Sequence, residues 1–145
     1  MNPTGPYDSQ ATASALAAFF ADDASGGDRY LERKRTAGAA SSELAHAWSK
    51  VRFAVQDARC ILDWGCRDGV FAWLARHELG ESTALYGCDI VAAEMYADIH
   101  QRIGLHYAAL AHVWQLPYAD DSFDAVLAGG TLEHVAQDGQ SLLEL

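Results

Sequence analysis

The chain has 145 residues, of which 50% are hydrophobic and 21% charged, a composition typical of an ordinary globular chain. Its 20 acidic and 10 basic residues give a formal net charge of -10, which argues against nonspecific binding of DNA, RNA or anionic lipid. A chain of this length buries enough surface to fold without a disulfide or a metal staple.

Three cysteines, Cys60, Cys66 and Cys88, form no CxxC pair, and no HxxxH spacing accompanies them. We interpret them as reduced thiols in a cytoplasmic protein without a metal site, with Cys66 and Cys88 as small buried hydrophobic groups. The apolar stretch at residues 11–21 lacks the basic segment of a secretory signal and is too short to span a bilayer. We therefore expect no membrane span.

The first 57 residues are predicted to form an N-terminal arm and a helical lid segment. A short helix is expected over residues 11–20, and a helical pattern runs from residue 28 to about residue 57. Small residues weaken the middle of that pattern, where Ser41 or Ser42 would cap a second helix. The apolar residues on one face of this second helix are Leu44, Trp48, Val51 and Val55.

Residues 58–145 alternate between short apolar runs and helical segments, which predicts βαβ units and a parallel sheet. We expect an α/β, Rossmann-like, doubly wound and mainly parallel sheet of four strands, with helices on both faces. Ligands of such sheets bind beyond the carboxyl ends of the strands. The expected strands are 60–64, 84–88, 105–110 and 122–128, and the expected helices are 70–79 and 91–103.

The loop after the first strand argues against two ligand classes. A P-loop requires a lysine after its glycines, and no lysine follows Lys50. A dinucleotide fingerprint requires three glycines, where this chain has Gly65, Arg67 and Val70. The carboxylate of Asp63 would also repel a pyrophosphate, whereas it would attract a cationic ligand.

Four ordered segments carry a family resemblance. Residues 61–69 are similar to the first motif of the class I S-adenosylmethionine-dependent methyltransferases, and Asp89 matches the acid that ends their second strand. Residues 116–124 and 132–135 look like later motifs of the small-molecule branch. The resemblance covers roughly residues 59–145. It implies S-adenosyl-L-methionine as cofactor and methyl transfer to an acceptor.

The same resemblance implies a role for individual residues. Asp63 would attract the amino group of the methionine moiety, Asp89 would accept both ribose hydroxyls, and Ile90 would pack against adenine. His112 and Val113 would lie at the adenine amino group. The expected cofactor-binding residues of the first loop are Gly65, Cys66, Arg67 and Gly69.

Some of these assignments have alternatives. Arg67 replaces the middle glycine of the motif, so its guanidinium either turns outward or pairs with the methionine carboxylate. His112 replaces an acid, and a neutral imidazole still accepts through one nitrogen. Asp89 would cap the next helix if it does not bind ribose. His134 is the candidate catalytic base, with a structural role for the Glu133-His134 pair as the alternative.

The segment after the fourth strand, residues 128–131, lacks the proline motifs of enzymes that methylate nucleobases or glutamine. A small-molecule, sugar or lipid-like acceptor is therefore expected. The alternatives are a noncatalytic S-adenosylmethionine-binding or interaction module and a nucleotide-dependent oxidoreductase. The family sheet has seven strands, so we expect this chain to be incomplete before the fifth. An open edge with uncovered Val126 and Leu127 would then favour self-association and leave the chain inactive alone.

Overall fold

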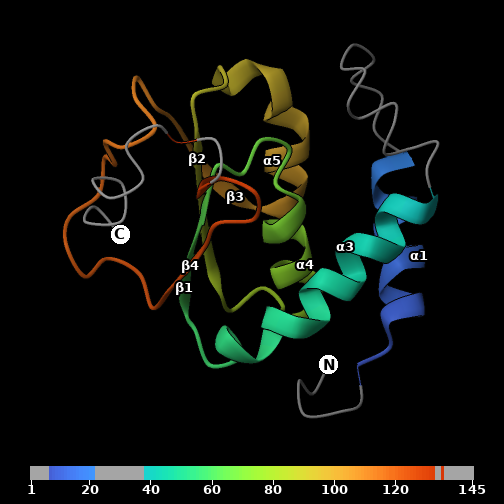
Figure 1. Cartoon of the computed structure of the whole chain (residues 1–145). Coiled ribbons are helices and arrows are strands. Elements are labelled where there is room, and N and C mark those ends of the chain that lie inside the picture. The colour runs from blue at the N-terminus through green and yellow to red at the C-terminus, as the bar shows by residue number, and fades with distance from the viewer. Residues whose placement is uncertain (1–6, 22–37, 133–134, 136–145) are drawn as a thin grey trace.

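The computed structural model of the chain describes residues 7–21, 38–132 and 135. Its four strands form one parallel sheet in the order β3-β2-β1-β4, flanked by helices (Figure 1). The α/β Rossmann-like fold predicted from the sequence is confirmed. The elements are α1 (Ser9–Ala21), α3 (Gly38–Val51), β1 (Cys60–Trp64), α4 (Val70–Leu79), β2 (Ala84–Asp89), α5 (Ala97–Ile103), β3 (Leu105–Ala109) and β4 (Ala125–Leu127), with 3-10 helices at Arg52–Ala54 and Ala93–Tyr96.

The strand order reverses next to β1. From β1 the chain crosses to β2 and then to β3 on one side, whereas β4 pairs with β1 on the other side. The register places Asp63 of β1 between Gly87 and Leu127. The strand order therefore reverses between β1 and β4, and the carboxyl ends of strands at such a point are where open α/β sheets bind ligands.

Two elements begin later than their patterns predicted. The helix expected from Val91 begins only at Ala97, after a 3-10 helix. The Tyr107 hydroxyl donates hydrogen bonds to the carbonyls of Asp89 and Val91, at 3.3 and 2.5 Å, and so holds this segment outside the helix. The strand expected from residue 122 begins only at residue 125, because the Ser122 hydroxyl is held in a turn by the Ala119 carbonyl.

The helix α3 begins earlier than predicted. It starts at Gly38, so Ser41 and Ser42 lie inside the helix and cannot cap it. Its expected apolar face is only partly buried: Trp48 is inaccessible to solvent, but 39% of Val51 is exposed. The chain turns into a 3-10 helix directly after Val51, which ends the periodicity on which the prediction rested.

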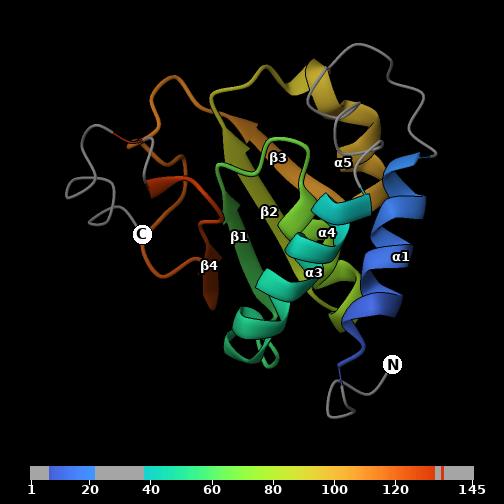
Figure 2. The ribbon, with the colours of Figure 1, turned by 45° about the vertical axis from the view of Figure 1, so that its right-hand side comes forward.

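The two faces of the sheet are covered differently (Figure 2). All the described helices lie on one face, where α1, α3, α4 and α5 share one apolar core with β1, β2, β3 and β4. In the described part of the chain, residues 110–123 cover the other face in place of the helices that we expected there. Aromatic side chains fill this second layer, and they include Tyr86, Tyr118 and Phe123.

A partly buried polar contact attaches α3 to α4. The indole nitrogen of Trp48 donates a hydrogen bond to the Glu78 carboxylate at 2.6 Å, and the Arg52 guanidinium pairs with the same carboxylate. Trp48 is fully buried in the core that also contains Trp73 and Ile61. The N-terminal helices therefore pack into the same core as the sheet.

The strand β4 is better covered than expected. Leu127 is only 8% exposed and belongs to the helix-side core, so the prediction that it is uncovered was wrong. Val55, in the segment that follows α3, belongs to the same core, and Val126 is partly buried against the aromatic layer on the other face. Within the described ranges β4 pairs only with β1, and self-association along its other side stays a prediction.

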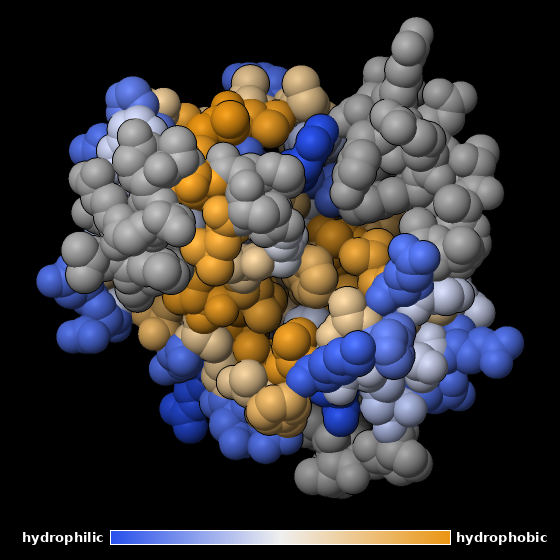
Figure 3. Space-filling model, viewed as in Figure 1, coloured by the Kyte–Doolittle hydropathy of each residue, from blue (hydrophilic) through white to orange (hydrophobic). Residues whose placement is uncertain are grey.

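An apolar groove of about 330 Å³ lies between α3 and β4. Figure 3 shows apolar side chains gathered in this region of the surface. The groove is lined by Ala47, Val51, Ala54, Val55, Phe71, Ala125, Val126, Leu127, Ala128 and Gly129. None of these side chains carries a charge. Among the described residues, no helix is both long enough and apolar enough to cross a membrane.

Replacement of Trp48 tests how strongly the N-terminal helices depend on this core. Trp48→Ala removes a fully buried indole and leaves the Glu78 carboxylate short of one donor, so we expect a loss of about 3–5 kcal/mol of unfolding free energy in urea titrations. Phe53→Ala is the control, because Phe53 is 67% exposed, and should change stability by less than about 0.5 kcal/mol. Equal effects of the two variants would contradict a shared core.

Candidate cofactor-binding site

The turn from β1 into α4 contains three residues with left-handed backbone conformation. Gly65, Arg67 and Gly69 have φ angles of 73°, 45° and 77°. The amides of Gly65 and Cys66 both donate to the carbonyl of Cys88, at 2.8 and 3.2 Å, so the turn is attached to the end of β2. Glycine adopts this conformation without steric cost, whereas the side chain at position 67 strains it.

Asp89 ends β2 beside this turn. Its Oδ2 accepts a hydrogen bond from the Arg67 amide at 2.9 Å, and its Oδ1 accepts one from the Ile90 amide at 2.7 Å. The helix-cap alternative does not hold, because the next helical segment has Ala92 at its cap position without a side-chain bond. A carboxylate has about four lone-pair sites, so both oxygens can accept further donors from a ligand.

A pocket of about 290 Å³ opens at this edge of the sheet. It contains five of the residues predicted to bind the cofactor: Gly65, Arg67, Asp89, Ile90 and Val113. It also contains residues that the sequence analysis did not assign to the site: Trp64, Val91, Leu110, Gly130, Thr131 and Val135. The pocket therefore combines one carboxylate and one guanidinium with an apolar wall.

The other predicted residues lie outside the lining of the pocket. Asp63 is buried, and its Oδ2 accepts a hydrogen bond from the Ala72 amide in the first turn of α4 at 3.0 Å. Gly69 is the N-cap residue of α4. His112 is exposed, and its ring stacks on Trp114 at a centroid distance of 4.8 Å. Contacts of these residues with a cofactor stay predictions, and His134 lies outside the described residues.

Burial keeps two cysteines at the site protonated. Cys66 and Cys88 are free and buried, as expected. Burial raises the pKa of Cys88 to about 12, and it raises the pKa of Cys66 further. Neither thiol is a nucleophile at neutral pH. No group of three or more metal-ligating side chains occurs within the described ranges.

Thr131 joins the loop after β4 to the end of β1. Its hydroxyl donates a hydrogen bond to the Trp64 carbonyl at 2.7 Å. A Cβ atom on Gly65 would lie only 2.2 Å from the Thr131 Oγ1, so the two loops are in close contact. The only sequence signal for this contact is the position of a threonine directly after the Gly129-Gly130 pair at the end of the fourth strand.

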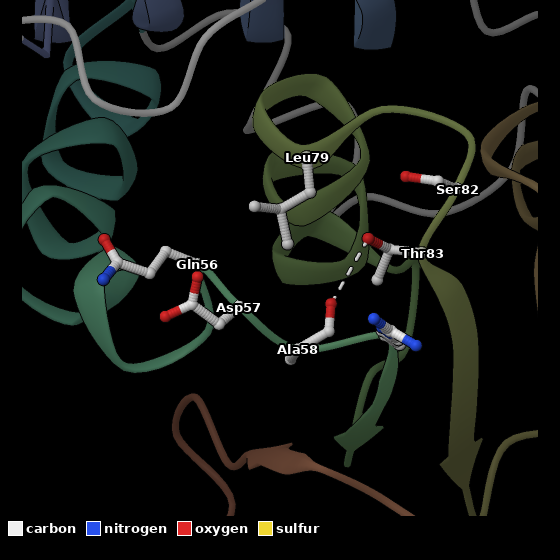
Figure 4. Close-up of a pocket in the computed structure, with 7 residues that line it drawn as sticks. Gln56, Asp57, Ala58, Leu79, Ser82 and Thr83 are labelled. Atoms are coloured by element: carbon white, nitrogen blue, oxygen red, sulfur yellow. Dashed lines mark hydrogen bonds between the residues drawn. The ribbon is translucent and has the colours of Figure 1, made fainter.

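A different pocket, of about 260 Å³, lies at the opposite edge of the sheet, where β1 and β2 begin (Figure 4). It is lined by Gln56, Asp57, Ala58, Arg59, Leu79, Ser82 and Thr83. The Thr83 hydroxyl faces the Ala58 carbonyl at 3.5 Å. Parallel sheets bind their ligands at the other edge, so this pocket is not the candidate site.

A parallel sheet with a pocket where its strand order reverses defines a class of α/β cofactor-binding domains. A family model described as a methyltransferase domain matches residues 62–145. The comparisons with curated proteins and with solved structures gave no match. Because the family model covers more than half of the chain, the chain belongs to the class I S-adenosylmethionine-dependent methyltransferases. Members of this family typically use S-adenosylmethionine for methyl transfer.

The contact between the two loops can be tested by adding a methyl group at Gly65. In Gly65→Ala the new methyl group would be strained by the left-handed backbone and would also clash with Thr131. In Gly104→Ala the backbone strain would be similar, but the nearest atom is Arg76 Nη2, at the flexible end of a side chain and 3.4 Å from the new Cβ. We expect Gly104→Ala to cost about 1–2 kcal/mol of unfolding free energy. Gly65→Ala should cost clearly more. Equal costs in urea titrations would show that the loops are not in contact.

Proposed function

We propose that the pocket at the ends of β1, β2 and β4 binds S-adenosyl-L-methionine and that the chain transfers a methyl group to a small acceptor. The observation that carries this proposal is the carboxylate of Asp89, held at the rim of the pocket by two backbone amides. A carboxylate in this position suits a pair of ribose hydroxyls, because both are donors that a single carboxylate can accept together.

The remaining lining supports the same ligand. Ile90 is 59% exposed at the pocket and next to Asp89, which suits packing against an adenine ring. Val113 and Leu110 extend this apolar wall. The Arg67 guanidinium, whose Nη2 lies 3.5 Å from the Tyr96 hydroxyl, would pair with the methionine carboxylate. Asp63 would contribute negative potential beneath the amino group.

The bound cofactor would supply an electrophilic methyl group on a sulfonium. The contribution of this chain is to position the acceptor in line and to exclude water, since an activated methyl donor needs little further chemistry from side chains. We propose His134 as the base for acceptors that must lose a proton. Val135, the next residue, lines the pocket, which supports this assignment.

The apolar groove between α3 and β4 supports a lipid-like acceptor over a sugar. Gly129 lines this groove, and the next two residues, Gly130 and Thr131, line the cofactor pocket. An acceptor that followed the groove would therefore approach the cofactor from the end of β4. A wall without charged groups stabilises apolar ligands, and it gives sugar hydroxyls no side-chain charge to bind.

Calorimetric titration with S-adenosylhomocysteine tests the cofactor assignment. Asp89→Ala should weaken binding by roughly 1.5–3 kcal/mol, or about ten- to a hundredfold, because charge-assisted hydrogen bonds to the ribose are lost. Asp89→Ala also removes the acceptor of the Arg67 and Ile90 amides. Asp89→Asn keeps one oxygen as an acceptor for the loop, so comparison of the two variants separates loss of ribose binding from loss of loop structure. Asp98→Asn, on the exposed side of α5, is the control. Unchanged affinity in Asp89→Ala would refute the ribose assignment.

An assay with radiolabelled S-adenosylmethionine tests the acceptor assignment. Where methyl transfer is detected, we expect an alkyl-substituted phenol or a fatty carboxylate to be at least about tenfold better as acceptor than free sugars, because the groove lacks polar partners. Val51→Asp, which places a charge at a 39% exposed position of the groove, should reduce transfer to the apolar acceptor and leave the affinity for S-adenosylhomocysteine unchanged. Equal transfer to both kinds of acceptor would contradict the assignment.

A further inference from the structure

One buried histidine lies directly beneath the first loop and has no part in the function proposed above. His100 is on α5 and only 4% exposed. Its Nε2 lies 2.6 Å from the Arg67 carbonyl oxygen, and its ring stacks on Tyr107 at a centroid distance of 4.5 Å. The Tyr107 hydroxyl in turn donates to the carbonyls of Asp89 and Val91. The histidine therefore contacts the first loop directly and the segment after β2 through Tyr107.

The contacts of the ring determine its protonation state. A carbonyl oxygen only accepts hydrogen bonds, so Nε2 carries a proton. The other ring nitrogen, Nδ1, is buried and has no hydrogen-bond partner among the described residues. A proton on Nδ1 would be a buried donor without an acceptor. His100 is therefore neutral, and burial lowers its pKa from the ordinary value.

The histidine completes a two-sided attachment of Arg67. The amide of Arg67 donates to Asp89, and its carbonyl accepts from His100. The backbone between these two bonds has a φ of 45°, which a residue with a side chain rarely adopts. Two opposed hydrogen bonds hold this residue in the left-handed conformation and thereby place the Arg67 amide on the Asp89 carboxylate.

We propose that His100 is a positioning residue for the cofactor: its Nε2 proton holds the Arg67 carbonyl, this fixes the backbone of Arg67, and the Arg67 amide orients the carboxylate of Asp89 at the pocket. The proposal rests on the proposed function, because it assigns Asp89 to the ribose. The family motif has glycine at position 67, where this chain has arginine. The proposal implies that Arg67 keeps the left-handed conformation because His100, 33 residues further along the chain, holds its carbonyl.

Acid should weaken the site through this histidine. Protonation of Nδ1 requires a rearrangement of the ring, because no acceptor faces it. The charged and titratable groups around the ring are Arg67 and Asp68 of the loop, Asp89 of β2, Tyr96 of the 3-10 helix and Tyr107 of β3. The two carboxylates favour the charged ring, but burial has the larger effect on its pKa. Cofactor affinity should be full above the pKa of His100 and fall as pH drops through it.

Three variants test the proposal by calorimetry with S-adenosylhomocysteine between pH 5 and 8. His100→Phe keeps an aromatic ring without the donor and should bind at least about tenfold more weakly at pH 7.5. His100→Gln offers an amide donor that does not titrate, so its affinity should be close to that of the parent chain and should fall less in acid. His106→Gln, at an exposed position on β3, should follow the parent chain.

Amide hydrogen exchange without ligand keeps the proposal testable if the cofactor assignment fails. The Arg67 and Gly69 amides should exchange at least about tenfold faster in His100→Phe than in His106→Gln. Faster exchange together with no S-adenosylhomocysteine binding by the parent chain would refute the proposed function but leave the attachment of the loop intact. Unchanged amide exchange in His100→Phe would overturn the inference. The inference would also be overturned if acid lowered the affinity of His100→Gln as much as that of the parent chain.

Discussion

The carbonyl of Cys88 accepts the two hydrogen bonds that attach the β1-α4 turn to the end of β2. They fix the start of the turn, with its three left-handed residues, next to Asp89. With them, the end of β1, the start of α4 and the carboxylate at the end of β2 form one unit. The pocket, the orientation of Asp89 and the contact with Thr131 all depend on this unit.

The sheet explains why the unit lies where it does. The strands are parallel and β1 lies between β2 and β4, so the loops after all three leave from the same edge. Helices cover one face, and residues 110–123 cover the other. The indole nitrogen of Trp64 donates to the Val113 carbonyl at 3.1 Å, which attaches that covering segment to the end of β1. The apolar wall of the pocket is thus held by the same strand as the turn.

Much of this architecture could be predicted because the signals are local. The bounds of β1 and α4 follow from an apolar run, a glycine-bearing turn and a helical period. Asp89 was placed at the ligand edge because it ends a strand of a parallel sheet, whereas Ile90 was assigned from the family resemblance of the neighbouring motifs. Each of these inferences needs only a few neighbouring residues and the rule that parallel strands share one edge.

Several of the errors and omissions arise where contacts are distant in the sequence. Tyr107 shortens the helix expected from Val91, although nothing in the local pattern indicates the bond. Thr131 and His100 contact the first loop from positions 67 and 33 residues away from their hydrogen-bond partners. Polar residues of this kind are common in loops and helices, so their partners become visible only when the fold is known.

The central claim is that the edge at which β1, β2 and β4 end is the cofactor-binding edge. Backbone amide chemical shifts recorded by NMR during titration with S-adenosylhomocysteine test it most directly. The account predicts that the largest changes gather at Gly65, Arg67, Ile90 and Val113. Changes that gather instead at Asp57 and the neighbouring residues of the pocket in Figure 4, or no changes at saturating ligand, would contradict it.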